Sequence, residues 1–281
     1  MTNTTVDVDL SAYRARIDYR GSMDPTLAVL ADLIAAHNRS IPFENVDPLF
    51  GVPVDDLTAP VLADKLLHRR RGGYCYEHNG LLGYVLEQMG LHVERLAGRV
   101  VWMQPPDAPL PAMTHTVLAV TGPELDGPHL VDVGFGGQTP TSPIRVITDV
   151  VQETRHEPYR LVEHAEGLAL EAQVRGQWTP LYAFSTQPRP PIDLVVGSWY
   201  VSTHPSSGFV TGLTAAMVTD DARWNLRGRN LAIHRDGSTE KIRFDTAAEV
   251  MVALDETFGI DLSDVADPEV AEARITQVLD S

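Results

Sequence analysis

Apolar residues recur every three or four positions in the first ninety residues of the chain, which is the spacing of one face of a helix. Three such runs lie at about 25–38, 58–71 and 81–89. A proline stands near the start of each of the first two runs, and Gly90 follows the third, as is typical of helix beginnings and ends. The pattern predicts a helical N-terminal region over residues 1–91.

The pattern changes after residue 92, where short alternating runs of apolar and polar residues are separated by prolines up to about residue 200. Such runs are typical of the strands of a β-barrel or sandwich. The remaining segment, 201–281, mixes both patterns. Its predicted elements are strands near Ala216, Ala232 and Ile242 and helices near 247–258 and 268–279. A chain of 281 residues with this order of elements predicts an α+β protein with more than one domain.

The only cysteine of the chain, Cys75, stands shortly before the third helical run. Gly72 and Gly73 allow a sharp turn just ahead of it. We therefore expect Cys75 at a helix N-terminus, where free N–H groups and the positive end of the helix dipole favour the nucleophilic thiolate. A buried and inert cysteine is the alternative, and the glycines and the helix start count against it.

Two β-rich runs, separated by the turn-rich segment 121–128, carry one histidine and one aspartate, His115 and Asp132. If facing residues of this hairpin have numbers that sum to 247 or 249, the two side chains share a face of the sheet, whereas an even sum separates them. Asp132 lies between two valines and needs a partner if it is buried. The alternatives to such a pair are that His115 is a core histidine with satisfied hydrogen bonds and that Asp132 accepts hydrogen bonds from the backbone. A thiol, an imidazole and a carboxylate in this order suggest a nucleophile, its base and the group that orients the base.

The chain resembles the arylamine N-acetyltransferase family, and more closely its actinobacterial members. The matching motifs run through nearly the whole chain: Ile-Pro-Phe-Glu-Asn at 41–45, Arg-Gly-Gly-Tyr-Cys at 71–75, Thr-His at 114–115, Val-Asp-Val-Gly-Phe-Gly at 131–136 and Ser-Thr-His-Pro-Ser-Ser-Gly-Phe at 202–209. Each motif is short, but the ordered set is highly specific. The resemblance places the catalytic residues of the family on Cys75, His115 and Asp132.

The activity that the resemblance implies is a two-step acetyl transfer in xenobiotic metabolism. The acetyl group would pass from acetyl-coenzyme A to Cys75, and then to the nitrogen of an arylamine or hydrazine or to the oxygen of an arylhydroxylamine. His115 would take the thiol proton and Asp132 would hold the imidazole, while the Cys75 N–H would help to bind the oxyanion. The pocket residues implied around the acetyl group are Thr114, Gly134, Phe135, Gly136 and Phe209.

The resemblance also implies an architecture of three domains around a core like that of cysteine proteases and transglutaminases. A helical bundle would cover 1–91 and carry the cysteine. A β-barrel would cover 92–200 and carry the histidine and aspartate, and an α/β lid would cover 201–281.

Charge limits the partners of the chain. Its net charge of −16 argues against nucleic acid as a partner, because phosphate binding relies on a basic surface. Coenzyme A is polyanionic too, so a local basic region is required. Segment 223–243 has six arginine or lysine residues against two acidic ones. It could be only a solvated face of a hairpin, but the resemblance makes His234 and Lys241 in it the expected coenzyme contacts.

Several other types of protein fit the sequence less well. Gly134-Phe135-Gly136-Gly137 follows a strand, but prolines at 140 and 143 prevent the helix that a dinucleotide site requires. A metal site made of Cys75, His78, His115 and Asp132 has little support from spacing, so no metal is expected. A cysteine hydrolase or a transglutaminase-like enzyme remains the alternative among enzymes, and a binding module with a structural thiol the alternative outside them.

The cellular setting also follows from the residues. One cysteine excludes an internal disulfide, and no apolar run is long enough to span a membrane. We expect a soluble cytoplasmic protein, where a reactive thiol stays reduced, as a monomer or homodimer.

Overall fold

The N-terminal part of the chain is helical in the computed structural model, which describes residues 7–105 and 108–281. The first six residues of the predicted helical region therefore lie outside the described residues. Its elements are α1 (Leu10–Arg16), α2 (Leu27–Ser40), β1 (Phe43–Glu44), α3 (Val46–Leu49), α4 (Ala59–Ala63), a π-helical turn η1 (Asp64–His68) and α5 (Cys75–Gln88). The three predicted helical runs are confirmed by α2, by α4 with η1, and by α5.

Helix α5 lies at the centre of this region. Its apolar positions Leu81, Leu82, Val85 and Leu86 are fully buried. They share one core with residues of α2 and with strands of the neighbouring sheet. The helix ends where predicted, since Gly90 follows it with a φ of +88°. Packing of α5 on that sheet brings the N-terminus of the helix to the strands that carry His115 and Asp132.

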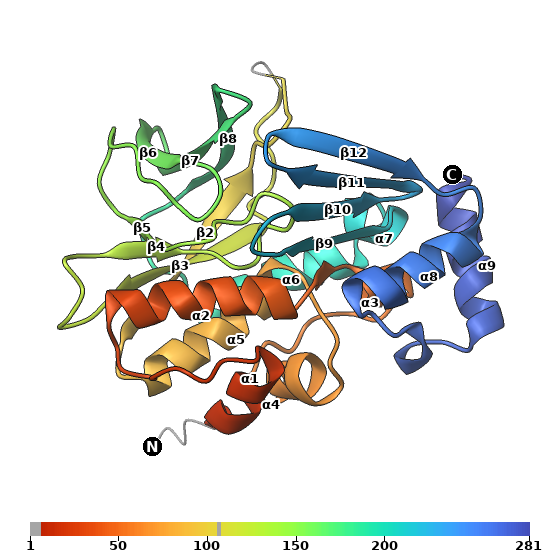
Figure 1. Cartoon of the computed structure of the whole chain (residues 1–281), viewed down its shortest axis with the longest axis horizontal. Coiled ribbons are helices and arrows are strands. Elements are labelled where there is room, and N and C mark those ends of the chain that lie inside the picture. Colours follow the sequence, from red (N-terminus) through yellow and green to blue (C-terminus); the bar gives the residue numbers. More distant parts are fainter. Residues whose placement is uncertain (1–6, 106–107) are drawn as a thin grey trace.

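That sheet has seven antiparallel strands, curled like a barrel (Figure 1). In chain order they are β2 (His92–Val100), β3 (His115–Thr121), β4 (His129–Val131), β5 (Ile144–Arg145), β6 (Tyr159–His164), β7 (Gly167–Val174) and β8 (Gln177–Phe184). They are arranged in the order β5-β4-β3-β2-β8-β7-β6. Strand β3 is buried on both faces, because α5 covers one face and the barrel interior the other.

The register of the β3–β4 hairpin confirms one of the two predicted solutions. Leu118 pairs with Val131 and Val120 with His129, so facing residues sum to 249. With this odd sum, His115 and Asp132 lie on the same face as diagonal neighbours.

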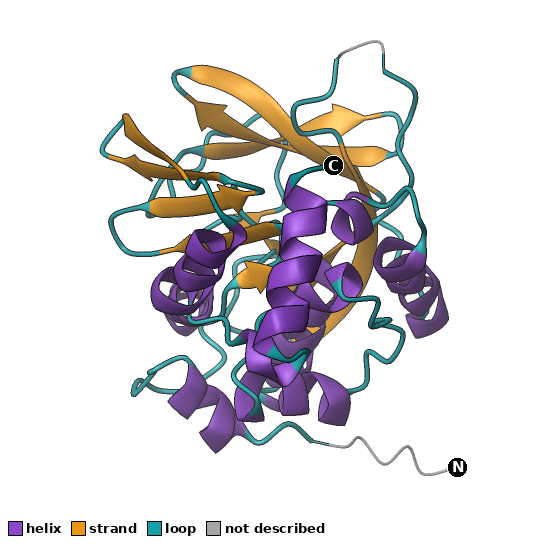
Figure 2. Ribbon diagram, turned by 90° about the vertical axis from the view of Figure 1, so that its right-hand side faces the viewer, coloured by secondary structure: helices purple, strands orange, loops and turns teal. Residues whose placement is uncertain are grey.

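A second sheet has five strands in the order β1-β9-β10-β11-β12. The elements of this part are α7 (Gly208–Thr211), β9 (Thr214–Val218), β10 (Arg223–Arg227), β11 (Asn230–Arg235), β12 (Ser238–Arg243), α8 (Ala247–Phe258), the short 3₁₀ turn η2 (Leu262–Asp264) and α9 (Pro268–Leu279). Helices α8 and α9 bury their apolar faces against this sheet. β1 comes from the N-terminal region and pairs with β9, so the first and last parts of the chain are joined. Figure 2 shows the strands of both sheets above most of the helices.

One prediction for region 92–200 is wrong, because α6 (Pro191–Thr203) is a helix and not a strand. Its sequence is rich in β-branched and aromatic residues, which favour strands. Pro191 at the first helical position sets the start of a helix, and burial of Leu194, Ser198 and Val201 at helical spacing stabilises it. The helix also runs across position 200, where the β region was expected to end.

Candidate active site

Cys75 is the first residue of α5 and is 4% exposed. The turn into the helix needs both glycines before it. A Cβ atom at Gly72 would lie 2.0 Å from the carbonyl oxygen of Pro42, and one at Gly73 would lie 2.5 Å from a carboxylate oxygen of Glu77. The thiol is 3.6 Å from the carbonyl oxygen of Thr114, to which it donates a hydrogen bond. The predicted position of Cys75 at a helix N-terminus is therefore confirmed.

His115 and Asp132 form a buried pair beside this thiol. His115 Nε2 lies 2.8 Å from Asp132 Oδ2, and both residues are at most 2% exposed. His115 begins β3 and Asp132 directly follows β4. Since Nε2 is engaged by the carboxylate, Nδ1 is the ring nitrogen left to exchange a proton with Cys75.

The charges of this pair stabilise each other. Burial by itself would lower the pKa of His115, but the Asp132 carboxylate outweighs burial and, with a contribution from Cys75, raises the pKa of His115 to about 10. Burial would likewise raise the pKa of Asp132, but His115 and the hydrogen bonds from Asn79 and the Gly134 N–H lower it. The imidazolium form of His115 is therefore favoured over a broad pH range.

Asn79 joins the His115–Asp132 pair to helix α5. It was not among the residues predicted for the site. Its Nδ2 donates to Asp132 Oδ1 at 2.9 Å and to the carbonyl oxygen of Thr116 at 2.7 Å. Its Oδ1 accepts the N–H of Val133 at 3.0 Å. The signal was present in the sequence, because Asn79 follows Cys75 by four positions and so lies on the same face of a helix.

Aromatic side chains enclose the imidazole. The ring centroids of Tyr182 and Phe135 lie 4.7 and 5.3 Å from that of His115. Burial, and then the charge of Asp132, raise the pKa of Tyr182 well above its usual value. The Tyr182 hydroxyl is buried and has no hydrogen-bond partner of normal geometry among the described residues. It contributes shape and exclusion of water rather than a proton.

The glycine-rich loop after β4 passes directly over the thiol. A Cβ atom at Gly134 would lie 2.6 Å from Cys75 Cα, so only glycine fits there. No helix begins in this loop, and Gly136 has a φ of +78°. The expectation that the motif is not a dinucleotide site agrees with this conformation.

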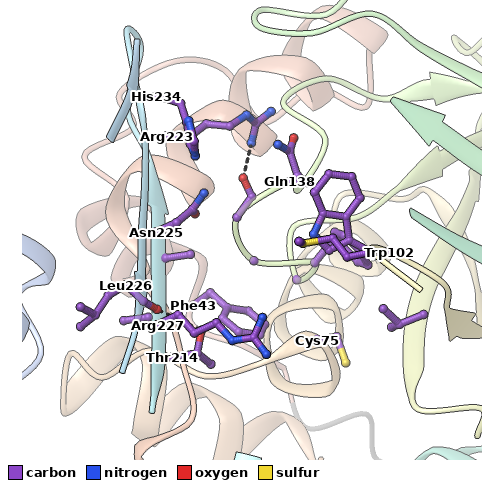
Figure 3. A pocket seen from close by; sticks show the side chains of 18 of the residues that line it. Phe43, Cys75, Trp102, Gln138, Thr214, Arg223, Asn225, Leu226, Arg227 and His234 are labelled. Atoms are coloured by element: carbon purple, nitrogen blue, oxygen red, sulfur yellow. Dashed lines mark hydrogen bonds between the residues drawn. The ribbon is translucent and has the colours of Figure 1, made fainter. Parts of the chain in front are cut away.

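A cavity of about 1330 Å³ opens in front of Cys75, between the two sheets (Figure 3). Figure 3 shows Arg223, Asn225 and Arg227 on the strands along one side and Trp102 near Cys75 on the other. Its lining includes most residues predicted for the site: Cys75, Thr114, His115, Gly134, Phe135, Gly136, Phe209 and His234. Asp132 lies behind His115, outside the lining. Lys241 is also outside the lining, on β12 opposite Ala232.

The basic segment 223–243 does not act as one surface. Arg223 is 1% exposed and binds the Glu157 carboxylate and the carbonyl oxygen of Thr139, so it is not free to bind a phosphate. Arg229 pairs with Asp280. Besides Arg223, the residues of the segment that line the cavity and carry or can carry a positive charge are Arg227, His234 and Arg235. Arg235 is paired with Asp221 at 2.8 Å, which leaves Arg227 as the arginine without a carboxylate partner among the described residues.

His78 points away from the cavity, although it is close to Cys75 in sequence. Its ring is bonded to His37 at 2.9 Å and to the carbonyl oxygen of Pro42 at 3.1 Å. The structure therefore does not join His78 to Cys75 and His115 as a ligand set. Among residues 7–105 and 108–281, no group of three or more His, Cys, Asp or Glu side chains has the geometry of a metal site. The same residues include no helix that is both long and apolar enough to cross a membrane.

Known proteins are similar to this chain in sequence and in fold. Residues 26–266 match the family model described as N-acetyltransferase. The arylamine N-acetyltransferase of Mycolicibacterium smegmatis is 65% identical over 98% of this chain and 99% of its own, and that of Escherichia coli is 34% identical over 91% and 90%. The solved arylamine N-acetyltransferase of Mycobacterium marinum in complex with CoA superposes with a TM-score of 0.94 at 64% identity, covering 96% of this chain and 99% of its own. With this much of its length matched at this identity, the chain belongs to the arylamine N-acetyltransferase family.

Proposed function

We propose that this enzyme transfers an acetyl group from acetyl-coenzyme A to the nitrogen of an arylamine or hydrazine, and to the oxygen of an arylhydroxylamine, through an acetyl thioester on Cys75. The observation that carries the proposal is the buried His115–Asp132 pair, 2.8 Å apart, beside a thiol at a helix N-terminus that opens to a large cavity. This arrangement has the nucleophile, base and orienting group that acyl transfer needs.

In the first half-reaction His115 Nδ1 takes the proton of Cys75, and the sulfur attacks the carbonyl carbon of the acetyl donor. The negative charge that forms on the carbonyl oxygen faces first-turn N–H groups of α5, which have no partner within their own helix. The C–S bond to coenzyme A then breaks, and the imidazolium of His115 returns the proton to the leaving thiolate. The acetyl group stays on Cys75 as a thioester.

In the second half-reaction the acceptor nitrogen attacks the carbon of the thioester. Neutral His115 takes a proton from this nitrogen, and Cys75 leaves as the thiolate. Asp132 remains ionised throughout and stabilises the imidazolium each time it forms. The two half-reactions use the same three side chains, which supports a ping-pong order.

The walls of the cavity match both substrates. Phe43, Trp102, Phe135 and Phe209 provide aromatic surface for the ring of an arylamine. Arg227 provides positive charge for the phosphates of the coenzyme, and His234 provides a hydrogen-bond donor, since burial lowers the pKa of its ring. Arg235, which pairs with Asp221, lines the same wall, and Lys241 lies on the next strand. The M. marinum relative was solved in complex with CoA, which supports coenzyme A as a ligand of this chain.

We also propose the setting in which the enzyme works. A catalytic thiol must stay reduced, which favours a compartment such as the cytoplasm. All three residues of the triad come from one chain, which is compatible with a monomer or a homodimer. We also propose that the chain divides into a helical bundle, a β-barrel and a lid. The first boundary lies near residue 91, and the second, expected at residue 200, falls within α6.

Mass spectrometry of the protein after mixing with acetyl-coenzyme A alone tests the proposal. We expect one acetyl group on Cys75 that is discharged when an arylamine is added. The Cys75→Ala variant should show neither the adduct nor turnover. An active Cys75→Ala enzyme would exclude the covalent mechanism, and rapid release of acetate without an amine would favour a hydrolase.

A further inference from the structure

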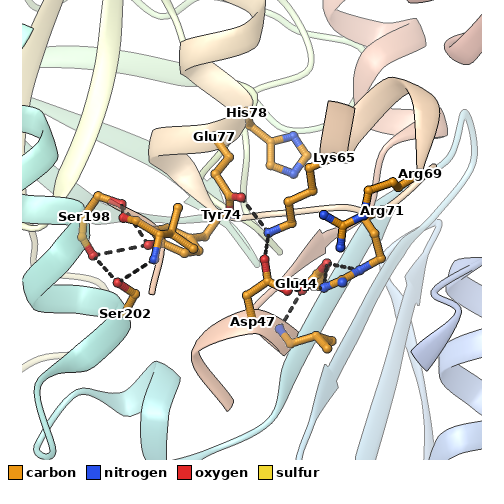
Figure 4. Close-up of polar contacts among 12 residues, drawn as sticks. Glu44, Asp47, Lys65, Arg69, Arg71, Tyr74, Glu77, His78, Ser198 and Ser202 are labelled. Carbon is orange, nitrogen blue, oxygen red and sulfur yellow. Dashed lines mark hydrogen bonds and ion pairs between the residues drawn. The ribbon is translucent and has the colours of Figure 1, made fainter. Parts of the chain in front are cut away.

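Five ionised side chains lie buried near the N-terminus of α5, and none of them belongs to the lining of the cavity (Figure 4). They are Glu44, Asp47, Lys65, Arg71 and Glu77, each between 1% and 6% exposed. Three of them are carboxylates and two are cations. Burying an ionised side chain costs free energy. The presence of five such side chains at one place therefore requires an explanation other than packing.

Lys65 joins two of the carboxylates. Its Nζ atom lies 2.6 Å from Glu77 Oε1 and 2.7 Å from Asp47 Oδ2. Burial would lower the pKa of Lys65, but Glu77, Glu44 and Asp47 raise it above its usual value, so the side chain remains a cation. Lys65 lies in the π-helical turn η1 and Glu77 in the first turn of α5, so the ion pair fixes one element against the other.

Glu77 in turn holds the start of the helix that carries Cys75. Its Oε2 accepts the backbone N–H of Tyr74 at 3.1 Å, as in a capping box. The same carboxylate lies against Gly73. Tyr74 directly precedes Cys75, so the position of the thiol depends on where the Glu77 carboxylate is held.

The negative charge of Glu77 disfavours the negative thiolate form of Cys75, which is the nucleophile. A negative carboxylate two residues from Cys75 opposes the formation of a thiolate, and the low dielectric of the interior strengthens this repulsion. Lys65 is the cation nearest to this carboxylate. Arg71 cannot replace it, because its guanidinium is already bound to Glu44, Asp47 and Asp264.

We propose that Lys65 and Glu77 are positioning residues for Cys75. The Glu77 carboxylate sets the first turn of α5, and the Lys65 ammonium holds that carboxylate and cancels its charge, so that the helix terminus can still favour the thiolate. The proposal rests on the role of Cys75 as the nucleophile.

Other titratable groups face the same region and are left unchanged in the test. Around Glu77 these are Asp47 from α3 and Glu44 from β1, and His78 from α5 itself lies close to Lys65 and Glu44. Around Cys75 they are His115, with Asp132 behind it, and the phenols of Tyr74 and Tyr76. A shift that follows the charge at positions 65 and 77 is therefore assigned to that pair.

The test measures the pH dependence of alkylation by iodoacetamide, which reports one site because the chain has a single cysteine. Lys65→Met should raise the midpoint of the alkylation curve by about one pH unit, the order of magnitude for one uncompensated charge nearby. Glu77→Gln, which keeps an oxygen for the Tyr74 N–H, should lower it. Lys65→Arg keeps the cation and should leave it within a few tenths of a unit.

The double variant Lys65→Met/Glu77→Gln separates charge from structure. It contains a neutral pair, so its midpoint should return close to that of the wild type, and it is expected to fold even if Lys65→Met alone does not. Glu87→Gln is the matched control, because Glu87 lies at the other end of α5 and pairs with Arg95 at the surface. Its curve should coincide with that of the wild type.

Two results would overturn the proposal. One is a shift in the same direction in Lys65→Met and Glu77→Gln, which would indicate structural damage. The other is an unchanged midpoint in Glu77→Gln, or a midpoint of the double variant that differs from that of the wild type by as much as Lys65→Met does. Failure of wild-type Cys75 to accept an acetyl group would instead contradict the proposed function, and it is measured separately on the wild type.

Discussion

The amide of Asn79 donates a hydrogen bond to Asp132 Oδ1 at 2.9 Å, and so joins the helix that carries Cys75 to the carboxylate that holds His115. The two residues come from segments more than fifty positions apart. Because the same amide also bonds both flanking strands, through Thr116 and Val133, all its donors and its acceptor are used. A single side chain thus fixes the distance between nucleophile and base.

We expect Asn79→Ala to lower kcat/KM for acetyl transfer by about tenfold or more, since misplacement of catalytic groups by about 1 Å can cost two orders of magnitude. It should also lower thermal stability, because buried groups lose their partners at about 1–3 kcal/mol each. Asn38→Ala is the control, since Asn38 is also buried and bonds the Pro140 carbonyl, away from the triad. It should lose stability but retain the rate. Equal rates in the two variants would show that Asn79 is only structural.

Asp132→Asn should lower the rate by several orders of magnitude, up to ~10⁴ by analogy with serine triads. The amide keeps the shape of the side chain but cannot stabilise an imidazolium, and it can hold His115 in the wrong tautomer. Single-turnover acetylation of Cys75 is the measurement, with circular dichroism to check the fold. A rate within about tenfold of the wild type in a folded protein would make Asp132 structural.

Tyr182→Phe should leave the rate within a few-fold and keep or raise the stability. The hydroxyl is buried without a hydrogen-bond partner among the described residues, and its removal relieves that cost, about 1 kcal/mol. Thermal unfolding and steady-state kinetics check both parts. A large loss of rate would show that the Tyr182 hydroxyl takes part in the chemistry near Asp132.

Sequence patterns predicted most of the fold where local signals and burial agree. Helices α5, α8 and α9 have apolar faces at helical spacing and clear starts and stops, and the structure has them at the predicted places. Helix α6 was missed because its residues favour strands locally, and only its tertiary contacts make it helical.

The residues of the site, like the elements of the fold, were predicted where the local sequence is distinctive and missed where only tertiary contacts matter. Cys75, His115 and Asp132 were identified because each is an unusual residue type in its own segment. Tyr182 was missed, because it is an ordinary residue of an apolar strand and only the curl of the sheet brings it to His115. Segment 223–243 was expected to be a basic region, but Arg223 is buried and paired with Glu157, a tertiary contact that the local sequence does not reveal.

Lys241→Ala should raise the KM for acetyl-coenzyme A and leave the KM for the amine nearly unchanged. A lysine near the coenzyme contacts phosphate in the donor half-reaction only. The effect should decrease at high salt, because Lys241 lies on an exposed strand. Arg229→Ala is the control from the same basic segment, since Arg229 is already neutralised by Asp280. Equal changes for both substrates would argue against a coenzyme site near β12.

The last prediction concerns two buried histidines outside the triad. The Pro42 carbonyl can only accept, so His78 Nε2 donates to it and His78 Nδ1 accepts from His37 Nε2. His37 Nδ1 then accepts from the Tyr13 hydroxyl. Both rings are therefore neutral, and an added proton has no acceptor. Burial lowers the pKa of His78 from 6.5 to about 4, and burial and then His78 lower that of His37 well below its usual value.

The sign of the pH effect follows from these shifts. Above pH 6.5 His78 is neutral in both the folded and the unfolded state, so it does not change the free energy of unfolding. Between pH 6.5 and about 4 the unfolded chain binds the proton and the folded chain does not, so the free energy of unfolding falls as the pH falls, by roughly 3 kcal/mol in total from His78. We expect urea unfolding to show this loss in the wild type.

His78→Gln should remove the share of that loss that comes from His78, because an amide can donate to Pro42 and accept from His37 without titrating, while His37 still titrates in the variant. Glu77 acts in the opposite direction, since burial, partly offset by Lys65, raises its pKa from 4.5 to about 6. Protonation of Glu77 therefore favours the folded state in that window. This contribution is present in both proteins and cancels in the difference between their unfolding curves. If the two proteins lose the same stability between pH 6.5 and 4, His78 is not a source of the acid sensitivity.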